Sequence, residues 1–232
     1  MLILGIESST LAAGCAIGGH EGVLAMAQVG RGRRHAESLA PQVQFICAQA
    51  QVELSEISVI AVDVGPGLFT GLRVGIATAK AFAHALRVPM IGVPSLDLLA
   101  FPVRFTSRLI AAAIDARRGE IYYAFYRQVP GGIQRLGEHC IGSPDDVASE
   151  LLASGEEVLL VGDGAYRYQE MFEGMSKVEL VDSGLSNPSA ASLVRLAHAR
   201  AMREQFQQPA SLEPIYLRKP DAEINWVTRD RG

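Results

Sequence analysis

The sequence has few cysteines, no long apolar run and no signature of a secreted protein. Its three cysteines, Cys15, Cys47 and Cys140, lie far apart with no C-x-x-C pair, which predicts reduced thiols in a cytoplasmic protein. No apolar stretch reaches the roughly 18 residues that a membrane span requires. The N-terminal stretch also lacks the basic flank of a signal peptide. These absences argue against a disulfide scaffold and predict a chain that does not enter a membrane.

An excess of charge of one sign is also missing. The 232 residues are 20% charged and 49% apolar with a net charge of −4, an ordinary globular composition with room for one large or two small domains. A negative net charge argues against autonomous nucleic-acid binding. One basic cluster, Arg31, Arg33 and Arg34, is the exception, and a solvated loop is its simpler interpretation.

The glycine-rich segment at residues 65–71 matches neither common phosphate-binding motif. Leu72 and Arg73 stand where a P-loop has Lys followed by Ser or Thr. The three glycines follow the spacing G-x-G-x-x-x-G, which differs from the dinucleotide fingerprint. Backbone N–H groups at the start of a helix could still hold an anion there.

Nucleophilic and metal motifs are absent as well. The sequence contains no G-x-S-x-G, and its five histidines show no H-E-x-x-H spacing. Carboxylates at predicted strand ends could converge on a metal ion in an α/β fold, although turns and caps are the commoner reason for such positions. The candidates are Glu7, Asp63, Asp115 and Asp163.

A ridge of small residues follows the glycine segment. Gly71, Gly75, Ala79 and Ala83 recur at every fourth position of a predicted helix over residues 70–86. Glycine inside a helix costs about 1 kcal/mol relative to alanine, so the ridge implies close approach of another backbone. A partner helix or packing inside the monomer would each explain it.

The predicted elements repeat one plan. Apolar, β-branched or aromatic runs between turn residues predict strands at 2–8, 12–18, 22–29, 58–64, 89–93, 108–117, 121–129, 133–141 and 158–164. Helical spacing predicts helices within 35–54, 70–86, 94–101, 143–155 and 188–206. Each half opens with a three-strand meander, so we expect a duplicated α/β unit with mixed sheets and a boundary near residues 103–108.

Several segments resemble a known family. ILGIESST resembles the first phosphate-loop strand of the actin-like ATPase superfamily. RRHAESLAP, GPGLFTGLRVG, IDARRGEIYYAFY and PIYLR resemble the bacterial TsaB (YeaZ) family, and the resemblance covers nearly the whole chain. That family implies two actin-like (RNase H-like) subdomains. It also implies an accessory role in making N6-threonylcarbamoyladenosine in tRNAs that read ANN codons.

The resemblance implies a non-catalytic subunit. The catalytic relative in the same pathway, a TsaD-type transferase, has a metal-binding histidine pair where Ser95 and Leu99 stand here, and neither side chain can replace an imidazole ligand. Glu7 stands where Asp is usual in the first phosphate loop. We therefore assign no catalytic or metal site to this chain and leave its cofactor-binding residues unassigned, and we expect the wider complex to use ATP.

The resemblance also implies partners. Family members pair with the transferase through helices of the N-terminal subdomain, in a complex that includes a small TsaE-type ATPase, and tRNA is met only through that complex. We place the interface on seven residues: Leu39, Val43, Ile46, Gly71, Gly75, Ala79 and Ala83. The same face could form a homodimer when the partner is missing.

The expected organisation has three parts. Residues 1–104 form the partner-binding subdomain, residues 105–218 form the second subdomain, and residues 219–232 form a mobile polar tail. Two other functions stay open. One is a free-standing actin-like ATPase, kinase or metalloprotease-like enzyme, and the other is direct tRNA contact through the basic cluster.

Overall fold

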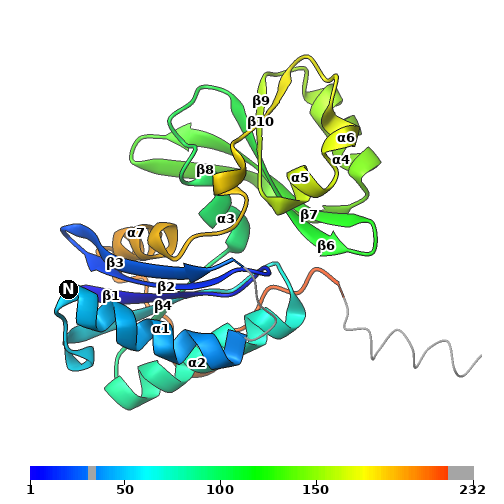
Figure 1. The fold of residues 1–232 in the computed structure, drawn as a ribbon. Helices are drawn as coiled ribbons and strands as arrows, with labels where there is room; N and C mark the ends of the chain where they lie inside the picture. The colour runs from blue at the N-terminus through cyan, green and yellow to red at the C-terminus, as the bar shows by residue number, and fades with distance from the viewer. Residues whose placement is uncertain (31–34, 219–232) are drawn as a thin grey trace, which may run out of the picture.

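Two five-stranded mixed sheets, one above the other, form the frame of the protein (Figure 1). The computed structural model describes residues 1–30 and 35–218. The basic cluster at residues 31, 33 and 34 and the tail at 219–232 lie outside the described residues.

The first sheet is built from the predicted N-terminal meander. Its strands are β1 (Leu2–Glu7), β2 (Ala13–Gly19), β3 (Gly22–Val29), β4 (Ile57–Asp63) and β5 (Met90–Val93), in the order β3-β2-β1-β4-β5. The meander pairs are antiparallel, whereas β4 and β5 continue the sheet in parallel with β1. Both β1 and β4 are almost wholly buried, as expected of central strands covered on both faces.

The second sheet has the same plan. Its strands are β6 (Leu109–Arg117), β7 (Glu120–Val129), β8 (Gly132–Gly142), β9 (Val158–Val161) and β10 (Val178–Leu180), in the order β10-β9-β6-β7-β8. An antiparallel meander is again followed by two parallel strands. The predicted duplication of one α/β unit is therefore confirmed.

Three helices cover the first sheet. The helices α1 (His35–Ala50) and α2 (Phe69–Leu86) pack on one face, and α7 (Ala190–Ala201) packs on the other. The α1–α2 core includes Leu39, Ile46 and Ala79, all fully buried. On the opposite face, Leu193, Val194 and Ala197 of α7 meet β1, β2 and β4.

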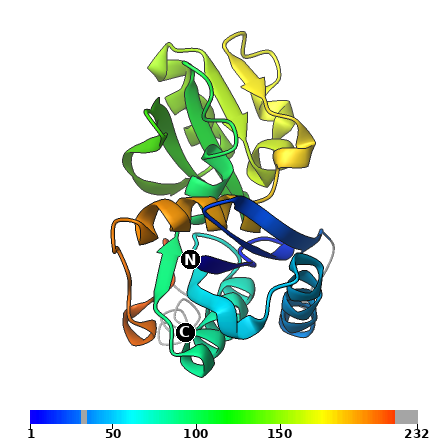
Figure 2. The ribbon, with the colours of Figure 1, turned by 90° about the vertical axis from the view of Figure 1, so that its left-hand side faces the viewer.

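The second sheet is also covered on both faces. The helix α3 (Ser95–Ala100) packs on one face, and α4 (Pro144–Ser154), α5 (Asp163–Arg167) and α6 (Gln169–Phe172) pack on the other. Short 3₁₀ turns lie at Leu54–Glu56, Ser183–Leu185 and Pro209–Ser211. In two perpendicular views, α7 lies between the two sheets (Figure 2).

The chain returns to the first half after it completes the second. The predicted second subdomain includes α7, which packs on the first sheet because its apolar face covers the side that α1 and α2 leave open. The segment after α7 also packs on the first half, since the Ile215 N–H donates to the Val64 carbonyl at 2.7 Å. The division of the chain into folding units at residues 104 and 105 stays a prediction. Within residues 1–30 and 35–218, no helix is long and apolar enough to cross a lipid bilayer.

Candidate functional site

Two buried carboxyl groups meet where β1 and β4 end. Glu7 is 0% exposed and Asp63 is 2% exposed. One oxygen of each, Glu7 Oε2 and Asp63 Oδ2, is buried without a hydrogen-bond partner among the described residues. Burial, together with the negative charge of Asp63, raises the pKa of Glu7 well above its usual range, and burial raises the pKa of Asp63 to about 6. Burial of the pair therefore favours the protonated form of each carboxyl group.

Glu7 and Asp63, which we call the acid pair, accept hydrogen bonds from the loops that follow β1 and β4. The Ser9 N–H donates to Glu7 Oε1 at 2.7 Å, and the Gly65 N–H donates to Asp63 Oδ1 at 2.7 Å. The Leu68 N–H donates to the Ser9 carbonyl, also at 2.7 Å. Three backbone donors at this end of the sheet are thus used internally. Ser9 is fully buried, so the segment resembling a phosphate loop does not fit a phosphate group.

Ser95 is a structural neighbour of the acid pair. Its hydroxyl donates to Asp63 Oδ1 at 2.5 Å, and the residue is fully buried at the start of α3. Leu99, one turn later, is 1% exposed and packs against the second sheet. The two positions that align with the metal-binding histidines therefore serve hydrogen bonding and packing.

The other two candidate carboxylates lie in the second half. Asp163 Oδ1 accepts the Asp115 N–H at 3.0 Å. Asp115 Oδ2 forms ion pairs with Arg117 at 2.9 Å and Arg167 at 3.2 Å. The four predicted carboxylates thus form two separate pairs. In the part of the chain that the structure describes, no group of three or more His, Cys, Asp or Glu side chains could hold a metal ion.

The seven residues predicted for the partner interface lie inside the monomer. Leu39, Val43, Ile46, Ala79 and Ala83 are at most 2% exposed and belong to the core between α1, α2 and the first sheet. Gly71 and Gly75 are buried as well. The small ridge is therefore an internal packing surface, the second of the two explanations that the sequence left open.

Ser8 lies against α2 at two glycines of that ridge, Gly71 and Gly75. Its hydroxyl donates to the Gly71 carbonyl at 2.9 Å. A Cβ added at Gly75 would lie well inside 3.0 Å of Ser8 Oγ, closer than Cβ atoms pack in folded proteins. The backbone of α2 can approach the end of β1 because Gly75 carries no side chain.

The outer faces of α1 and α2, which do not pack on the first sheet, are exposed to solvent. Phe45 of α1 is 56% exposed, an unusual position for a large aromatic ring. A groove of about 580 Å³ runs between the two helices, lined by Ala40, Gln44, Cys47, Ala48 and Phe82 among others. The helical spacing of apolar residues in α1 indicates only its buried face, so it gives no sign of Phe45 on the exposed face.

Two family motifs meet at the start of α2. The ring centroids of Phe69 and Tyr216 are 5.5 Å apart, and the Arg73 guanidinium carbon lies 3.9 Å from the Phe69 centroid. Arg73 Nε also donates to the Tyr216 hydroxyl at 3.1 Å. The glycine-rich motif and the late PIYLR motif thus form one partly exposed aromatic cluster, although 143 residues separate Arg73 from Tyr216.

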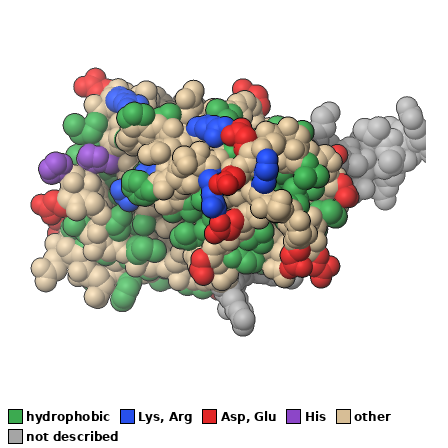
Figure 3. Space-filling model, turned by 90° about the horizontal axis from the view of Figure 1, so that it is seen from above, with side chains coloured by type: hydrophobic (Ala, Val, Ile, Leu, Met, Phe, Trp, Pro, Cys, Tyr) green, Lys and Arg blue, Asp and Glu red, His purple; other side chains and the backbone are tan. Residues whose placement is uncertain are grey.

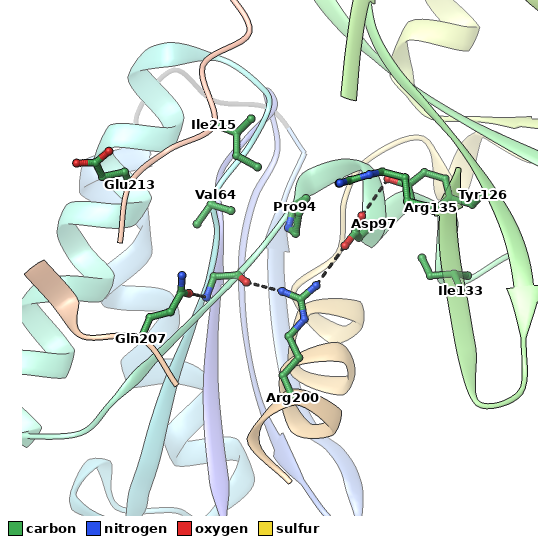
Figure 4. A pocket seen from close by; sticks show the side chains of 11 residues that line it. Val64, Pro94, Asp97, Tyr126, Ile133, Arg135, Arg200, Gln207, Glu213 and Ile215 are labelled. Carbon is green, nitrogen blue, oxygen red and sulfur yellow. Dashed lines mark hydrogen bonds and ion pairs between the residues drawn. The ribbon is translucent and has the colours of Figure 1, made fainter. Parts of the chain in front are cut away.

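A cavity of about 520 Å³ lies where the two halves face each other (Figure 4). Arg200 donates to the Gly92 carbonyl at 2.6 Å and lies 3.3 Å from Asp97 Oδ2. The Tyr126 hydroxyl reaches the same carboxylate from the second half, at 3.0 Å. The charged groups on this wall therefore pair with one another and join the halves.

Charge is mixed on the face of the molecule seen from above (Figure 3). Blue and red side chains alternate there, and neither sign gathers into a patch. Arg108 pairs with Glu157 at 3.2 Å and with Glu179, and Arg127 pairs with Glu156. Such a face offers no electrostatic footprint for a nucleic acid.

Relatives of the chain carry one recurring description. The family model described as "TsaD: tRNA N6-adenosine threonylcarbamoyltransferase" matches residues 30–226. The Escherichia coli "tRNA threonylcarbamoyladenosine biosynthesis protein TsaB" is 31% identical over 189 residues, which cover 80% of this chain and 81% of that protein. An uncharacterized Mycobacterium leprae protein is 35% identical over 95% of this chain, which spans 56% of that longer relative.

Solved structures agree with these relatives. The structure "YeaZ from Pseudomonas aeruginosa" has a TM-score of 0.82 and 29% sequence identity, covering 93% of this chain and 99% of that chain. Component A of the Acidaminococcus fermentans (R)-2-hydroxyglutaryl-CoA dehydratase has a TM-score of 0.54 over 87% of this chain at 11% identity, a likeness of fold alone. The predicted fold, two actin-like subdomains with mixed sheets, is confirmed.

Proposed function

The chain belongs to the TsaB (YeaZ) family, and from this membership we propose that it is an accessory subunit in the synthesis of N6-threonylcarbamoyladenosine in tRNA. In this role it binds and activates a TsaD-type threonylcarbamoyl transferase and does no group transfer itself. The modified tRNAs are those that read ANN codons, and the chain meets them only within the complex. Three free thiols are consistent with work in the cytoplasm.

One observation supports the non-catalytic role most directly. The acid pair and its loops use Ser9, Gly65 and Ser95 in buried internal hydrogen bonds. A nucleotide or metal site needs donors or ligands that are free to face a substrate. At this end of the first sheet the same groups stabilise the loops.

We place the partner surface on the outer faces of α1 and α2. Phe45 supplies an exposed apolar ring on α1, and the groove along another side of α1 supplies a pocket, two features of protein interfaces. A transferase packing there would bring its own helices against these two. In its absence a second copy of the chain covers the same face, and the small TsaE-type ATPase joins the assembled pair.

The test is co-purification of the chain with its transferase. Phe45→Asp introduces a charge at an exposed site, so we expect the variant to fold normally by circular dichroism but to lose at least about tenfold in affinity for the partner. Leu152→Asp is the matched control, because Leu152 is 68% exposed on α4 in the other half of the molecule. Equal pairing by both variants would move the interface to another face.

Activity assays separate this role from the alternative of a free-standing enzyme. The purified chain alone should form no threonylcarbamoyladenosine, and the chain with its transferase and ATPase should form it. Tight ATP binding by the isolated chain, lost in Glu7→Ala, would instead favour an actin-like ATPase.

A further inference from the structure

The connection between the two halves carries an unusually exposed aromatic ring. Phe105 lies in the segment between α3 and β6 and is 78% exposed. Burial of a phenylalanine side chain is favourable, and an exposed ring contributes none of this free energy. A ring this exposed is therefore a candidate contact for a ligand or partner. The surroundings of Phe105 indicate what it can bind.

Phe105 is the open end of a stack of rings and guanidinium groups. The Arg104 guanidinium carbon lies 3.9 Å from the Phe101 centroid and 4.1 Å from the Phe105 centroid. Arg195 of α7 lies 5.2 Å from the Phe101 centroid. We name Phe101, Arg104, Phe105 and Arg195 the hinge stack. Its inner members are fixed, since Arg104 is 8% exposed and donates to the Phe101 carbonyl at 2.7 Å.

The two arginines of the hinge stack have no acidic partner among the described residues. Arg108, four residues after Arg104, shows the contrast, because it pairs with both Glu157 and Glu179. Burial and the nearby charge of Arg195 lower the pKa of Arg104, as expected for two cations without a counter-ion. In a chain with a net charge of −4, this spot is a local excess of positive charge.

We propose that the hinge stack binds an unpaired nucleotide of an RNA, with the base on the open face of Phe105 and the phosphate near Arg104 and Arg195. A nucleotide supplies a planar ring and a negative charge in one unit, which matches both properties of the stack. An acidic peptide would match only the charge. This proposal deepens the proposed function, since it gives the RNA of the complex a contact on this chain.

The experiment measures binding of the full chain to a fluorescent single-stranded RNA of about 12 nucleotides by anisotropy, at low salt. We expect weak but saturable binding that Phe105→Ala weakens about tenfold and that Phe105→Trp preserves, because stacking needs only an aromatic face. Arg195→Ala should lower the dependence of affinity on salt by about one phosphate contact. Leu152→Ala, which removes an exposed apolar side chain on α4, is the matched control and should bind RNA like the unaltered chain.

Three outcomes would overturn the proposal. The first is no RNA binding by the unaltered chain, and the second is equal binding by Phe105→Ala and Leu152→Ala. In the third, Phe105→Ala binds RNA normally but no longer pairs with the transferase, which would make the hinge stack a protein surface. The proposed function is judged separately, from co-purification of Phe45→Asp, so either idea can fail alone.

Discussion

Gly75 lets a serine side chain touch the backbone of a helix. A Cβ at this position would collide with Ser8 Oγ, which is itself tied to the Gly71 carbonyl. Gly75→Ala should therefore lower the free energy of unfolding by about 2 kcal/mol, although alanine favours helices. Urea denaturation measures this change. Gly30→Ala is the control and should be neutral, since nothing lies within 4 Å of an added Cβ at Gly30.

The interpretation of Gly75 would fail if Gly75→Ala were as stable as the unaltered chain. A further check removes the other collision partner. In a Ser8→Ala background, Gly75→Ala should lose less stability than it does alone, because the two changes act on one contact.

Glu7 makes stability depend on pH in an unusual direction. Its pKa lies above its ordinary value of about 4.3, so the folded chain binds a proton that the unfolded chain releases. The free energy of unfolding is thus highest below that ordinary value and falls as pH rises through the folded pKa. Asp63, with a pKa of about 6, adds its own decline at lower pH.

Glu7→Gln should remove the part of this decline that belongs to Glu7. Glutamine cannot ionise, so we expect the variant to lose less stability than the unaltered chain as pH rises from the ordinary value of about 4.3 through the folded pKa, by on the order of 1 kcal/mol. Guanidinium denaturation at several pH values measures it. Glu21→Gln, at an exposed position, should follow the unaltered chain. Parallel curves for both variants would contradict a raised pKa of Glu7.

The helix α7 shows how one element completes a layer. Leu193 is fully buried against the first sheet, far along the chain from the strands that it covers. Leu193→Ala should cost about 2–5 kcal/mol, because it leaves a cavity beneath the helix. Met202→Ala, at the C-terminal end of α7, should cost almost nothing, since Met202 is 69% exposed. Thermal unfolding compares the two, and similar melting temperatures would argue against this packing.

Elements were predicted well where local chemistry sets them. The start of α4 is set by Ser143 and Pro144, since Ser143 Oγ accepts the Asp146 N–H and Pro144 occupies the first helical position. The meanders and the helix over residues 70–86 also appear at nearly the predicted bounds. These features depend on spacing and capping over a few residues, which a sequence displays directly.

The candidate site was harder to predict because it depends on which face an element turns inward. Helical spacing grouped Leu39, Val43 and Ile46 on one stripe, but spacing alone cannot tell a core from an interface. The acid pair required the ends of β1 and β4 to be neighbours, and the hinge stack required α7 to return beside α3. Such contacts span tens to hundreds of residues and follow from topology.

At the scale of the whole molecule, the first sheet depends on both ends of the described chain. Residues 1–104 alone would leave the α7 face of the sheet bare, so we expect this fragment to aggregate or stay unfolded. Replacing residues 105–188 with a short Gly-Ser linker should restore a folded first half. Far-ultraviolet circular dichroism and urea denaturation distinguish the two. Cooperative unfolding of the 1–104 fragment would show that α7 is dispensable.

The late arrival of α7 also sets an order of events during synthesis. A ribosome that adds about 5–20 residues per second needs about 5–20 s to pass from the end of β5 to the end of α7. Throughout that interval the nascent chain carries one uncovered apolar face, while the second half acquires all its strands and helices. The half that is translated first is therefore the half that matures last, and that interval is when chaperones have most to protect.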